Sequence, residues 1–196
     1  MGKGRLEAFS DGVIAVIITI MVLEIKVPHG ADLDALREVI PLFASYVLSF
    51  IVIGIYWNGH HHMLHVAKRI DANIMWLNLH LLFWLSLIPV STGWVGDHPH
   101  DMVPAAFYGG IFLLCAIAFN LLQGAIRRRH TDDPAVVAAL SRRGKGVLSE
   151  VMYAAGIGLA FVHPYIADAL YVGVAAMWFV PDRNIAKVAS KHDHGT

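Results

Sequence analysis

The stretch RLEAFSDGVIAVIITIMVLEIKVP, residues 5–28, decides the fold of this chain. Its apolar run extends from Gly12 to Leu23, is interrupted only by Thr19, and is flanked by Asp11 and Glu24. A helix over this run rises about 18 Å, which is less than the ~30 Å of a bilayer's hydrocarbon core. Both carboxylates are therefore near or inside the membrane boundary, where charged side chains face protein or water. The stretch predicts a central membrane helix surrounded by other spans.

One face of this predicted helix is almost entirely apolar. With successive residues ~100° apart, a stripe forms at spacings of three and four. It comprises Arg5, Phe9, Gly12, Val16, Thr19, Ile20, Leu23 and Val27. Ser10 and Asp11 point away from it, more than about 100° from its centre.

Two interpretations of the stripe and the polar pair are open. In the first, the stripe packs against other helices and the polar pair holds spans together. In the second, the stripe lines a pore and the polar pair anchors the helix behind it.

The composition is that of an integral membrane protein. Of 196 residues, 57% are hydrophobic and 15% charged, and the mean hydropathy is +0.57, which is too apolar for an ordinary soluble domain. The formal net charge is zero, so nothing indicates a nucleic-acid partner. The single cysteine, Cys115, excludes a disulfide or a Cys-based metal site within one chain.

Six apolar segments, each long enough to span a bilayer as a helix, predict one all-α domain over residues 1–196. The segments are residues 6–27, 41–60, 73–93, 104–126, 146–163 and 165–181. The end of the first segment, LEIKVPHG at residues 23–30, lacks a small-x-small cleavage pattern, so we expect the segment to be retained. Pro89 is expected to kink the third span, with Ser86 or a neighbour satisfying the freed carbonyl. The short HPYIAD between the last two predicts a tight helical hairpin.

The basic residues favour one orientation. If the N-terminus is cytoplasmic, the cytoplasmic pieces are 1–5, 61–72, 127–145 and 182–196, and they hold 13 of the 15 Lys and Arg residues. Only Lys26 and Arg37 remain outside. The positive-inside rule therefore predicts a multi-pass protein of the cell membrane with both termini cytoplasmic. Segment 127–145 is expected to hold a short helix over 134–140, N-capped by Asp133, and its basic ends are expected to contact anionic lipid.

The motif Arg5-x-x-x-Phe9-Ser10-Asp11 at the start of the first span resembles the signature of the transmembrane protein 175 family of potassium channels. Six spans, a chain near 200 residues and the exit TIMVLEIKVP also resemble its prokaryotic single-repeat members. The resemblance implies a homotetramer with the first helix of each chain lining a central pore. It also implies selection by rings of apolar side chains on the first helix, with a Thr or Ser ring among them. Members of the family lack the usual potassium-channel filter loop, and this chain likewise has no TVGYG-like stretch.

Carried over by distance from the FSD aspartate, the pore rings fall on Val16, on Thr19 or Ile20, and on Leu23. Larger Ile or Leu is common in the family at the Val16 level, so the tightest ring is expected to move to Ile20 or Leu23. Four Thr19 hydroxyls would partly replace the water that a potassium ion loses. Permeant potassium is the only ligand expected, with no cofactor and no metal site.

Arg5, Phe9, Ser10 and Asp11 are then structural residues. Asp11 is near the cytoplasmic end of its span, at the depth where the second span ends and the third begins. Its candidate partners are Asn58, His60, His61, Asn73, Asn78 and His80. Of these, Asn58, His61 and Asn78 complete the predicted anchoring network, which sets the rotation of the helix. Glu24 is a candidate for the external pore mouth, or for a contact with a neighbouring chain.

The histidines of HHHMLH, His60–His65, offer a further interpretation. His61 and His65 are four residues apart, a spacing that can hold a metal ion, and a proton sensor is a second possibility. No carboxylate or thiolate accompanies them until Asp71. We therefore interpret the cluster as an interfacial helix end.

The main alternative function is a proton- or ion-coupled secondary transporter that uses Asp11. Such transporters pair interrupted spans at the midplane, and neither such a pair nor a second intramembrane carboxylate is evident in the sequence. A membrane metalloenzyme would need His-x-x-Glu pairing, which is absent from the cluster. No nucleophile motif, phosphate loop or dinucleotide fingerprint indicates an enzyme.

Overall fold

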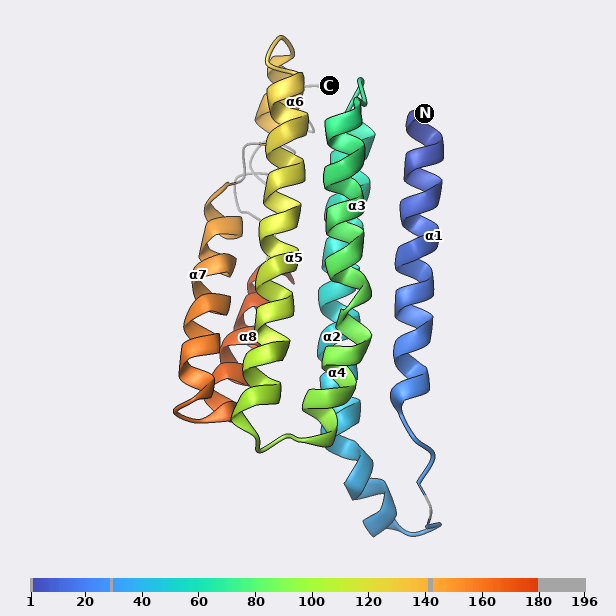
Figure 1. Ribbon diagram of the computed structural model, residues 1–196, viewed down its shortest axis with the longest axis vertical. Coiled ribbons are helices and arrows are strands. Elements are labelled where there is room, and N and C mark those ends of the chain that lie inside the picture. The colour runs from blue at the N-terminus through green and yellow to red at the C-terminus, as the bar shows by residue number, and fades with distance from the viewer. Residues whose placement is uncertain (1, 29, 141–142, 180–196) are drawn as a thin grey trace, which may run out of the picture.

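In the computed structural model, which describes residues 2–28, 30–140 and 143–179, all regular structure is helical (Figure 1). Most helices run side by side along one axis. They are α1 (Lys3–Met21), η1 (Val22–Glu24), α2 (Leu33–Val66), α3 (Ala72–Ser86), α4 (Ile88–Asp97), α5 (Met102–Arg129), α6 (Pro134–Ala139), α7 (Arg143–Ala160) and α8 (Pro164–Phe179).

Four stretches of the described chain are long and apolar enough to cross a membrane: Lys3–Glu24, Leu33–Val66, Ala72–Asp97 and Met102–Arg129. The last three contain the second, third and fourth predicted spans, and the first overlaps the predicted span 6–27 but ends at Glu24. α7 and α8 lie at the fifth and sixth, joined by residues 161–163, and pack against each other. α8, with 16 residues, is apolar but shorter than each of these four stretches, and residues 180–181 of the sixth predicted span lie outside the described residues.

The second helix is much longer than the predicted 41–60. It starts at Leu33, where the Asp32 side chain accepts a hydrogen bond from the Ala35 N–H at 2.9 Å, and it continues to Val66. An aspartate in this position satisfies one of the free N–H groups of the first turn. Pro41 lies inside the helix, so the sequence alone favoured a start at that residue.

Pro89 does more than kink the third span. The helix ends at Ser86 and a new helix, α4, begins at Ile88 with Pro89 in its first turn. The Leu87 N–H turns back to the carbonyls of Leu85 and Trp84, so a neighbour satisfies the carbonyl that Pro89 leaves free. The Ser86 hydroxyl instead donates to the Phe83 carbonyl at 2.7 Å.

The core is formed largely by α5, whose buried face includes Tyr108, Phe112, Cys115 and Leu122. α5 packs against α3, α4, α7 and α8. Tyr171 of α8 lies so close to Gly109 of α5 and Gly156 of α7 that a Cβ at either glycine would overlap its ring. Small residues at helix contacts allow this close packing in membrane proteins.

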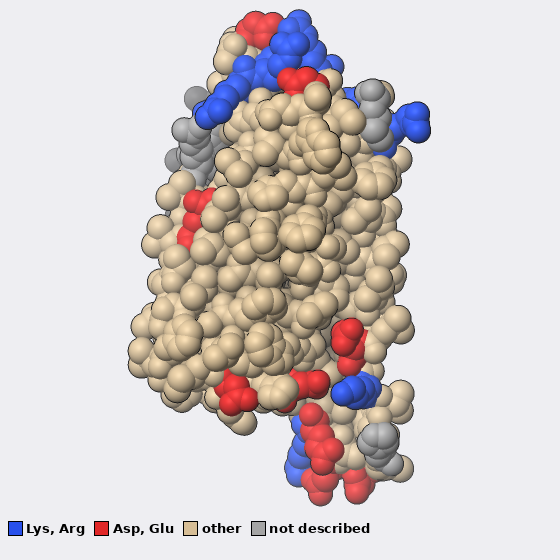
Figure 2. Space-filling view, viewed as in Figure 1, with Lys and Arg blue, Asp and Glu red and all other residues tan. Residues whose placement is uncertain are grey.

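The charges separate along the long axis of the molecule. Figure 2 shows Lys and Arg gathered at the end that holds the start of α1 and the end of α5, while the opposite end is mostly acidic. The short α6 lies at the basic end, and its predicted N-cap is confirmed: the Asp133 carboxylate accepts from the N–H groups of Ala135 and Val136. The helix ends at Ala139, one residue before the predicted limit.

Candidate functional site

The two faces of α1 have opposite environments. Leu6, Ser10, Ile14, Ile17 and Met21 are buried, on the face that packs against α2, α3 and α4. The stripe on the other face is uncovered in a single chain: Val16 is 54% exposed, Ile20 43% and Leu23 77%. Thr19, Gly12 and Phe9 are exposed as well. The structure therefore leaves the predicted stripe without a partner inside the described chain.

A chain of hydrogen bonds fixes the buried face. The His60 Nε2 lies 2.7 Å from the Asn78 Oδ1, the Asn78 Nδ2 donates to the Ser10 Oγ at 2.9 Å, and Ser10 donates to the Leu6 carbonyl at 2.9 Å. Because the amide oxygen only accepts, His60 is the donor in the first bond. All three side chains are buried. The chain connects α2, α3 and α1, so it sets both the position and the rotation of α1.

Asp11 is held by a residue that the sequence did not indicate. The Trp57 Nε1 of α2 donates to the Asp11 Oδ1 at 3.0 Å. The predicted direct partners of Asp11 are therefore wrong: in the described structure, Asn78 donates to Ser10 instead, and His60 binds Asn78. Ser10 is at the centre of the buried face and Asp11 ~100° from it, so α3 faces Ser10 and the flank of α2 reaches Asp11.

The other predicted anchoring residues lie outside this network. Asn58 and His61 are exposed, and within the described residues neither hydrogen-bonds to Ser10 or Asp11. Asn58 follows Trp57 by one residue and so lies about 100° from it around α2. His61 follows Trp57 by four residues and shares its face, but lies one turn further along the helix. His61 does touch the ring of Trp57, with centroids 6.2 Å apart. Arg5 and Phe9 are exposed on the same side as the stripe.

Thr19 presents an oxygen rather than a hydrogen on the exposed face. Its hydroxyl donates to the Val16 carbonyl at 2.9 Å. A hydroxyl has one hydrogen and two lone pairs, so this bond uses the hydrogen and leaves the lone pairs as acceptors. An acceptor oxygen is the group that a cation binds.

Glu24 lies beside the stripe and against its own chain. Its Oε2 is 3.1 Å from the position that a Cβ would take on Gly93 of α4. The next charged residue, Lys26, lies 3.8 Å from Asp97, with both side chains exposed. This packing places Glu24 against α4, at the acidic end of the molecule.

The histidine cluster divides into two environments. His60 is buried in the hydrogen-bond chain, whereas His61, His62 and His65 are exposed. The rings of His61 and His65 stack with centroids 6.2 Å apart, which confirms that they share one helix face. Within the described ranges, no three His, Cys, Asp or Glu side chains are grouped as a metal site would require.

Two carboxylates within helices were missed in the sequence. Glu150 of α7 accepts a hydrogen bond from the Asn120 Nδ2 of α5 at 2.7 Å, and Asp168 lies in α8, partly buried. The available signal was simple: each is an isolated acidic residue in a predicted span. Neither lies near Asp11 in the described contacts.

Comparisons with known proteins agree with this architecture. The sequence model of the family described as endosomal/lysosomal potassium channel TMEM175 matches residues 5–89, which cover α1 to the start of α4. A potassium channel of Chryseobacterium sp. is 46% identical over 95% of this chain and 97% of its own. The chain belongs to the TMEM175 family.

Two further relatives extend the comparison. A potassium channel of Streptomyces collinus is 36% identical over 94% of this chain and 97% of its own. A crystal structure described as a lysosomal potassium-selective channel TMEM175 homolog from Chamaesiphon minutus matches with a TM-score of 0.80. It shares 30% identity, over 90% of this chain and 95% of that one.

Family membership and the long apolar helices make this TMEM175 relative a multi-pass membrane protein. The match spans nearly the whole chain, and these relatives are named as channels rather than enzymes.

Proposed function

We propose that this chain is a potassium channel in which four copies surround a central pore lined by α1. The observation that carries the proposal is the contrast between the two faces of α1: a buried hydrogen-bond chain fixes one, and the other leaves Val16, Ile20 and Leu23 uncovered. The stripe also contains Arg5 and Thr19, which favour water over lipid. Two relatives that match nearly the whole chain are named potassium channels.

In this pore, rings of Val16, Ile20 and Leu23 form the narrow part. An apolar ring a few ångströms across disfavours water and gates by dewetting. Potassium holds its hydration shell less firmly than sodium, so such a constriction favours potassium to a modest degree. The Thr19 oxygen, whose lone pairs stay free as acceptors, compensates for part of the lost hydration. The tightest ring is at Ile20 or Leu23, because Val16 is smaller.

The proposed topology has six spans, with α7 and α8 as the last two and both termini in the cytoplasm. The gathering of Lys and Arg at the end that holds the start of α1 supports this orientation (Figure 2). The acidic end, with Glu24, then faces the outside of the cell membrane. A ring of four Glu24 carboxylates there would raise the local cation concentration, although the contact of Glu24 with Gly93 holds each carboxylate against its own chain.

Ser10 and Asp11 are anchors in this proposal. Ser10 is buried in the connection to Asn78 and His60, and Asp11 is tied to Trp57. A transporter that used Asp11 as an ion site would need that carboxylate to bind and release its ligand. The hydrogen bond from Trp57 and the names of the relatives favour the channel.

Recording from the purified protein in a planar bilayer under a potassium/sodium gradient tests the proposal. A channel gives single-channel steps whose reversal potential shifts toward that of potassium. Slow, saturable, proton-coupled flux without steps would show a transporter. Cross-linking of the protein in the same preparation measures the subunit number, which we expect to be four.

A further inference from the structure

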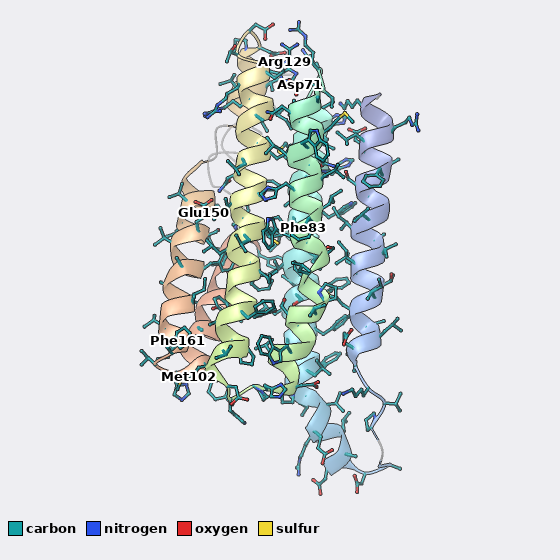
Figure 3. All side chains as sticks on the ribbon, in the orientation of Figure 1. Asp71, Phe83, Met102, Arg129, Glu150 and Phe161 are labelled. Carbon is teal, nitrogen blue, oxygen red and sulfur yellow. The ribbon has the colours of Figure 1, made fainter. Side chains whose placement is uncertain are left out.

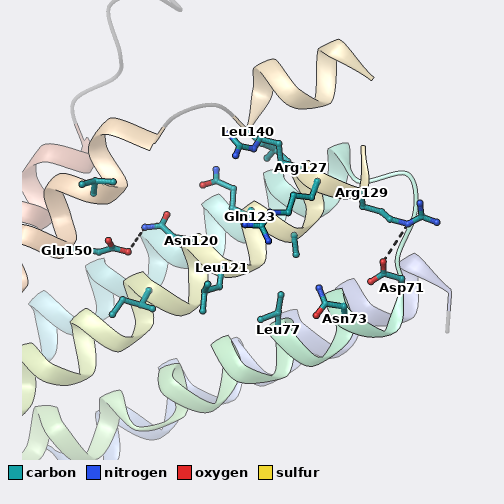
Figure 4. Close-up of a pocket in the computed structure, with 15 residues that line it drawn as sticks. Asp71, Asn73, Leu77, Asn120, Leu121, Gln123, Arg127, Arg129, Leu140 and Glu150 are labelled. Atoms are coloured by element: carbon teal, nitrogen blue, oxygen red, sulfur yellow. Dashed lines mark hydrogen bonds and ion pairs between the residues drawn. The ribbon is translucent and has the colours of Figure 1, made fainter. Parts of the chain in front are cut away.

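A pocket far from α1 lies between α3, α5 and α7 at the basic end of the molecule (Figure 4). Its volume is about 710 Å³. The Asp71–Arg129 pair lies at one end and the Asn120–Glu150 pair at the other. Figure 3 places Arg129 near the tip of the molecule and Glu150 well below it, along α7. The pocket therefore extends from the basic tip down between the helices.

The upper part of the pocket carries an excess of positive charge. Arg127, Arg128 and Arg129 all line it, and Arg129 is paired with Asp71, with Nε and Oδ2 3.5 Å apart. Arg127 is half-buried, and no ion pair or side-chain hydrogen bond to it is formed within the described residues. Its guanidinium therefore remains available to an anion that enters the pocket. Its planar fork matches a phosphate, which it binds through two parallel hydrogen bonds.

The lower part of the pocket is apolar. Its wall includes Leu77, Ile117, Leu121 and Val147. Leu121 is 49% exposed and Val147 52%, so apolar surface remains uncovered inside the pocket. Glu150 lies beyond this wall, where its carboxylate already accepts a hydrogen bond from Asn120 at 2.7 Å. Asn120 precedes Arg127 by seven residues in α5, about 10 Å along the helix, so the carboxylate does not face an anion held at Arg127.

The depth of these residues matches that of a lipid. α5 has 28 residues, about 42 Å, so it exceeds the ~30 Å hydrocarbon core by several residues. Arg127–Arg129 at its end are then level with the headgroups, while Leu121 and Ile117 are about 9 and 15 Å deeper. Basic pockets between spans on the cytoplasmic side bind anionic headgroups. A small soluble anion would use the arginines but leave the apolar wall uncovered.

We infer that this pocket binds one anionic phospholipid, with its phosphate at Arg127 and an acyl chain against Leu121 and Val147. The inference rests on the membrane orientation given under the proposed function, but not on the pore. The lipid connects α3, α5 and α7 at the basic end of the molecule. It makes the lipid composition of the cytoplasmic leaflet a determinant of the channel's stability.

Native mass spectrometry of the full-length protein with added phosphatidylglycerol or phosphatidylcholine tests this inference. We expect tighter binding of phosphatidylglycerol. Arg127→Gln should weaken its binding about five-fold, the effect of one basic residue near an anionic lipid surface. Arg69→Gln is the matched control, because Arg69 lies at the same end but pairs with Asp132 at 3.6 Å outside the pocket. It should leave the binding unchanged.

A second variant fills the pocket without removing charge. A Cβ on Gly124, which lines the pocket, has no neighbour within 4 Å, so Gly124→Leu adds bulk there without a clash of its Cβ. It should abolish the preference for phosphatidylglycerol. The control is Gly110→Leu, because Gly110 lies in the same helix and is equally free of neighbours, but is outside the pocket. This variant should keep the preference for phosphatidylglycerol.

Three results would overturn the inference: equal binding of both lipids by the wild type, an equal loss in Arg69→Gln and Arg127→Gln, or displacement of the lipid by inorganic phosphate. The last would show a site for a soluble anion. Bilayer recordings on the same preparations keep the two proposals separate. Normal potassium currents without lipid preference reject only the lipid site, and lipid preference without currents rejects only the channel.

Discussion

The Asn78 side-chain amide of α3 donates to the Ser10 hydroxyl of α1 at 2.9 Å, and both side chains are fully buried. This bond, continued to His60 of α2 at 2.7 Å, fixes which face of α1 turns inward. The opposite face, with Val16, Ile20 and Leu23, is thereby turned out of the subunit. A polar contact within one chain thus determines which residues a neighbouring chain, or a pore, can meet.

Ser10→Ala should destabilise the protein by about 1–3 kcal/mol, because it leaves the buried Asn78 amide without an acceptor. Unfolding of the protein by denaturant in detergent, followed by tryptophan fluorescence, measures the loss. Ser86→Ala is the matched control, because the exposed Ser86 hydroxyl binds only a carbonyl of its own helix. Equal stability of Ser10→Ala and wild type would show that the hydrogen-bond chain does not stabilise the protein.

Trp57→Phe keeps an aromatic ring in α2 but removes the donor to Asp11. We expect a lower fraction of assembled protein and a lower conductance with the potassium preference unchanged, because the rotation of α1 is loosened. Size-exclusion chromatography and bilayer recording measure both. Trp76→Phe is the control, since Trp76 is exposed and its ring nitrogen makes no hydrogen bond in the described structure. Asp11→Ala should act in the same direction, and normal assembly and conductance in that variant would refute the anchoring role.

Ile20→Asn and Leu23→Asn should increase the leak current and shift the reversal potential toward the nonselective value, because a polar ring admits water where an apolar ring excludes it. Recording under a potassium/sodium gradient measures both effects. Val22→Asn, exposed but ~120° from the centre of the stripe, should leave selectivity intact. Unchanged currents in both stripe variants would mean that the stripe does not face the pore.

The α6 region should lose structure in acid. The hydrogen bond from Lys68, at 2.6 Å, and those from backbone N–H groups of α6 lower the pKa of the Asp133 carboxyl below its usual range. Because this pKa is lower in the folded state, the carboxylate stabilises α6 fully above about pH 3.9, the ordinary aspartate value. The stabilisation is lost as the pH falls through the lowered folded-state pKa.

Hydrogen exchange of the α6 amides between pH 5 and pH 2, corrected for intrinsic rates, measures this loss. Asp133→Asn retains a cap that can accept the N–H groups but cannot be protonated in this range. It should therefore show no acid-dependent loss of protection. The same loss in wild type and variant would assign the effect to other carboxylates.

Much of the architecture is readable from the sequence because it depends on hydrophobic length and period. The spacing of Val16, Ile20 and Leu23 predicted an apolar stripe with Ser10 on the other face, and Pro89 predicted a disturbance in the third span. Two features depend on local capping. The helix is interrupted at Leu87, and α2 extends over Leu33–Val66 rather than the predicted 41–60. Asp32, which caps α2, could have been read as a start signal.

The partners within the network were less predictable because they depend on helix rotation as well as depth. Asn78 and His60 were expected to bind Asp11, yet Asn78 binds Ser10 and His60 binds Asn78, because α3 faces that side of α1. Trp57 reaches Asp11 instead, and nothing in the sequence distinguishes its indole N–H from other donors at this level. Pairing between helices requires their relative positions, which one sequence does not supply.

Block of the current by a thiol-reactive ion shows whether the exposed face of α1 lines the pore. The single native cysteine, Cys115, is buried, so the wild type should resist externally added silver ions. Leu23→Cys should give channels that silver blocks rapidly and that pass current before its addition. Val22→Cys should resist as the wild type does. Block of Val22→Cys together with full resistance of Leu23→Cys would show that the face of α1 with Leu23 does not line the pore.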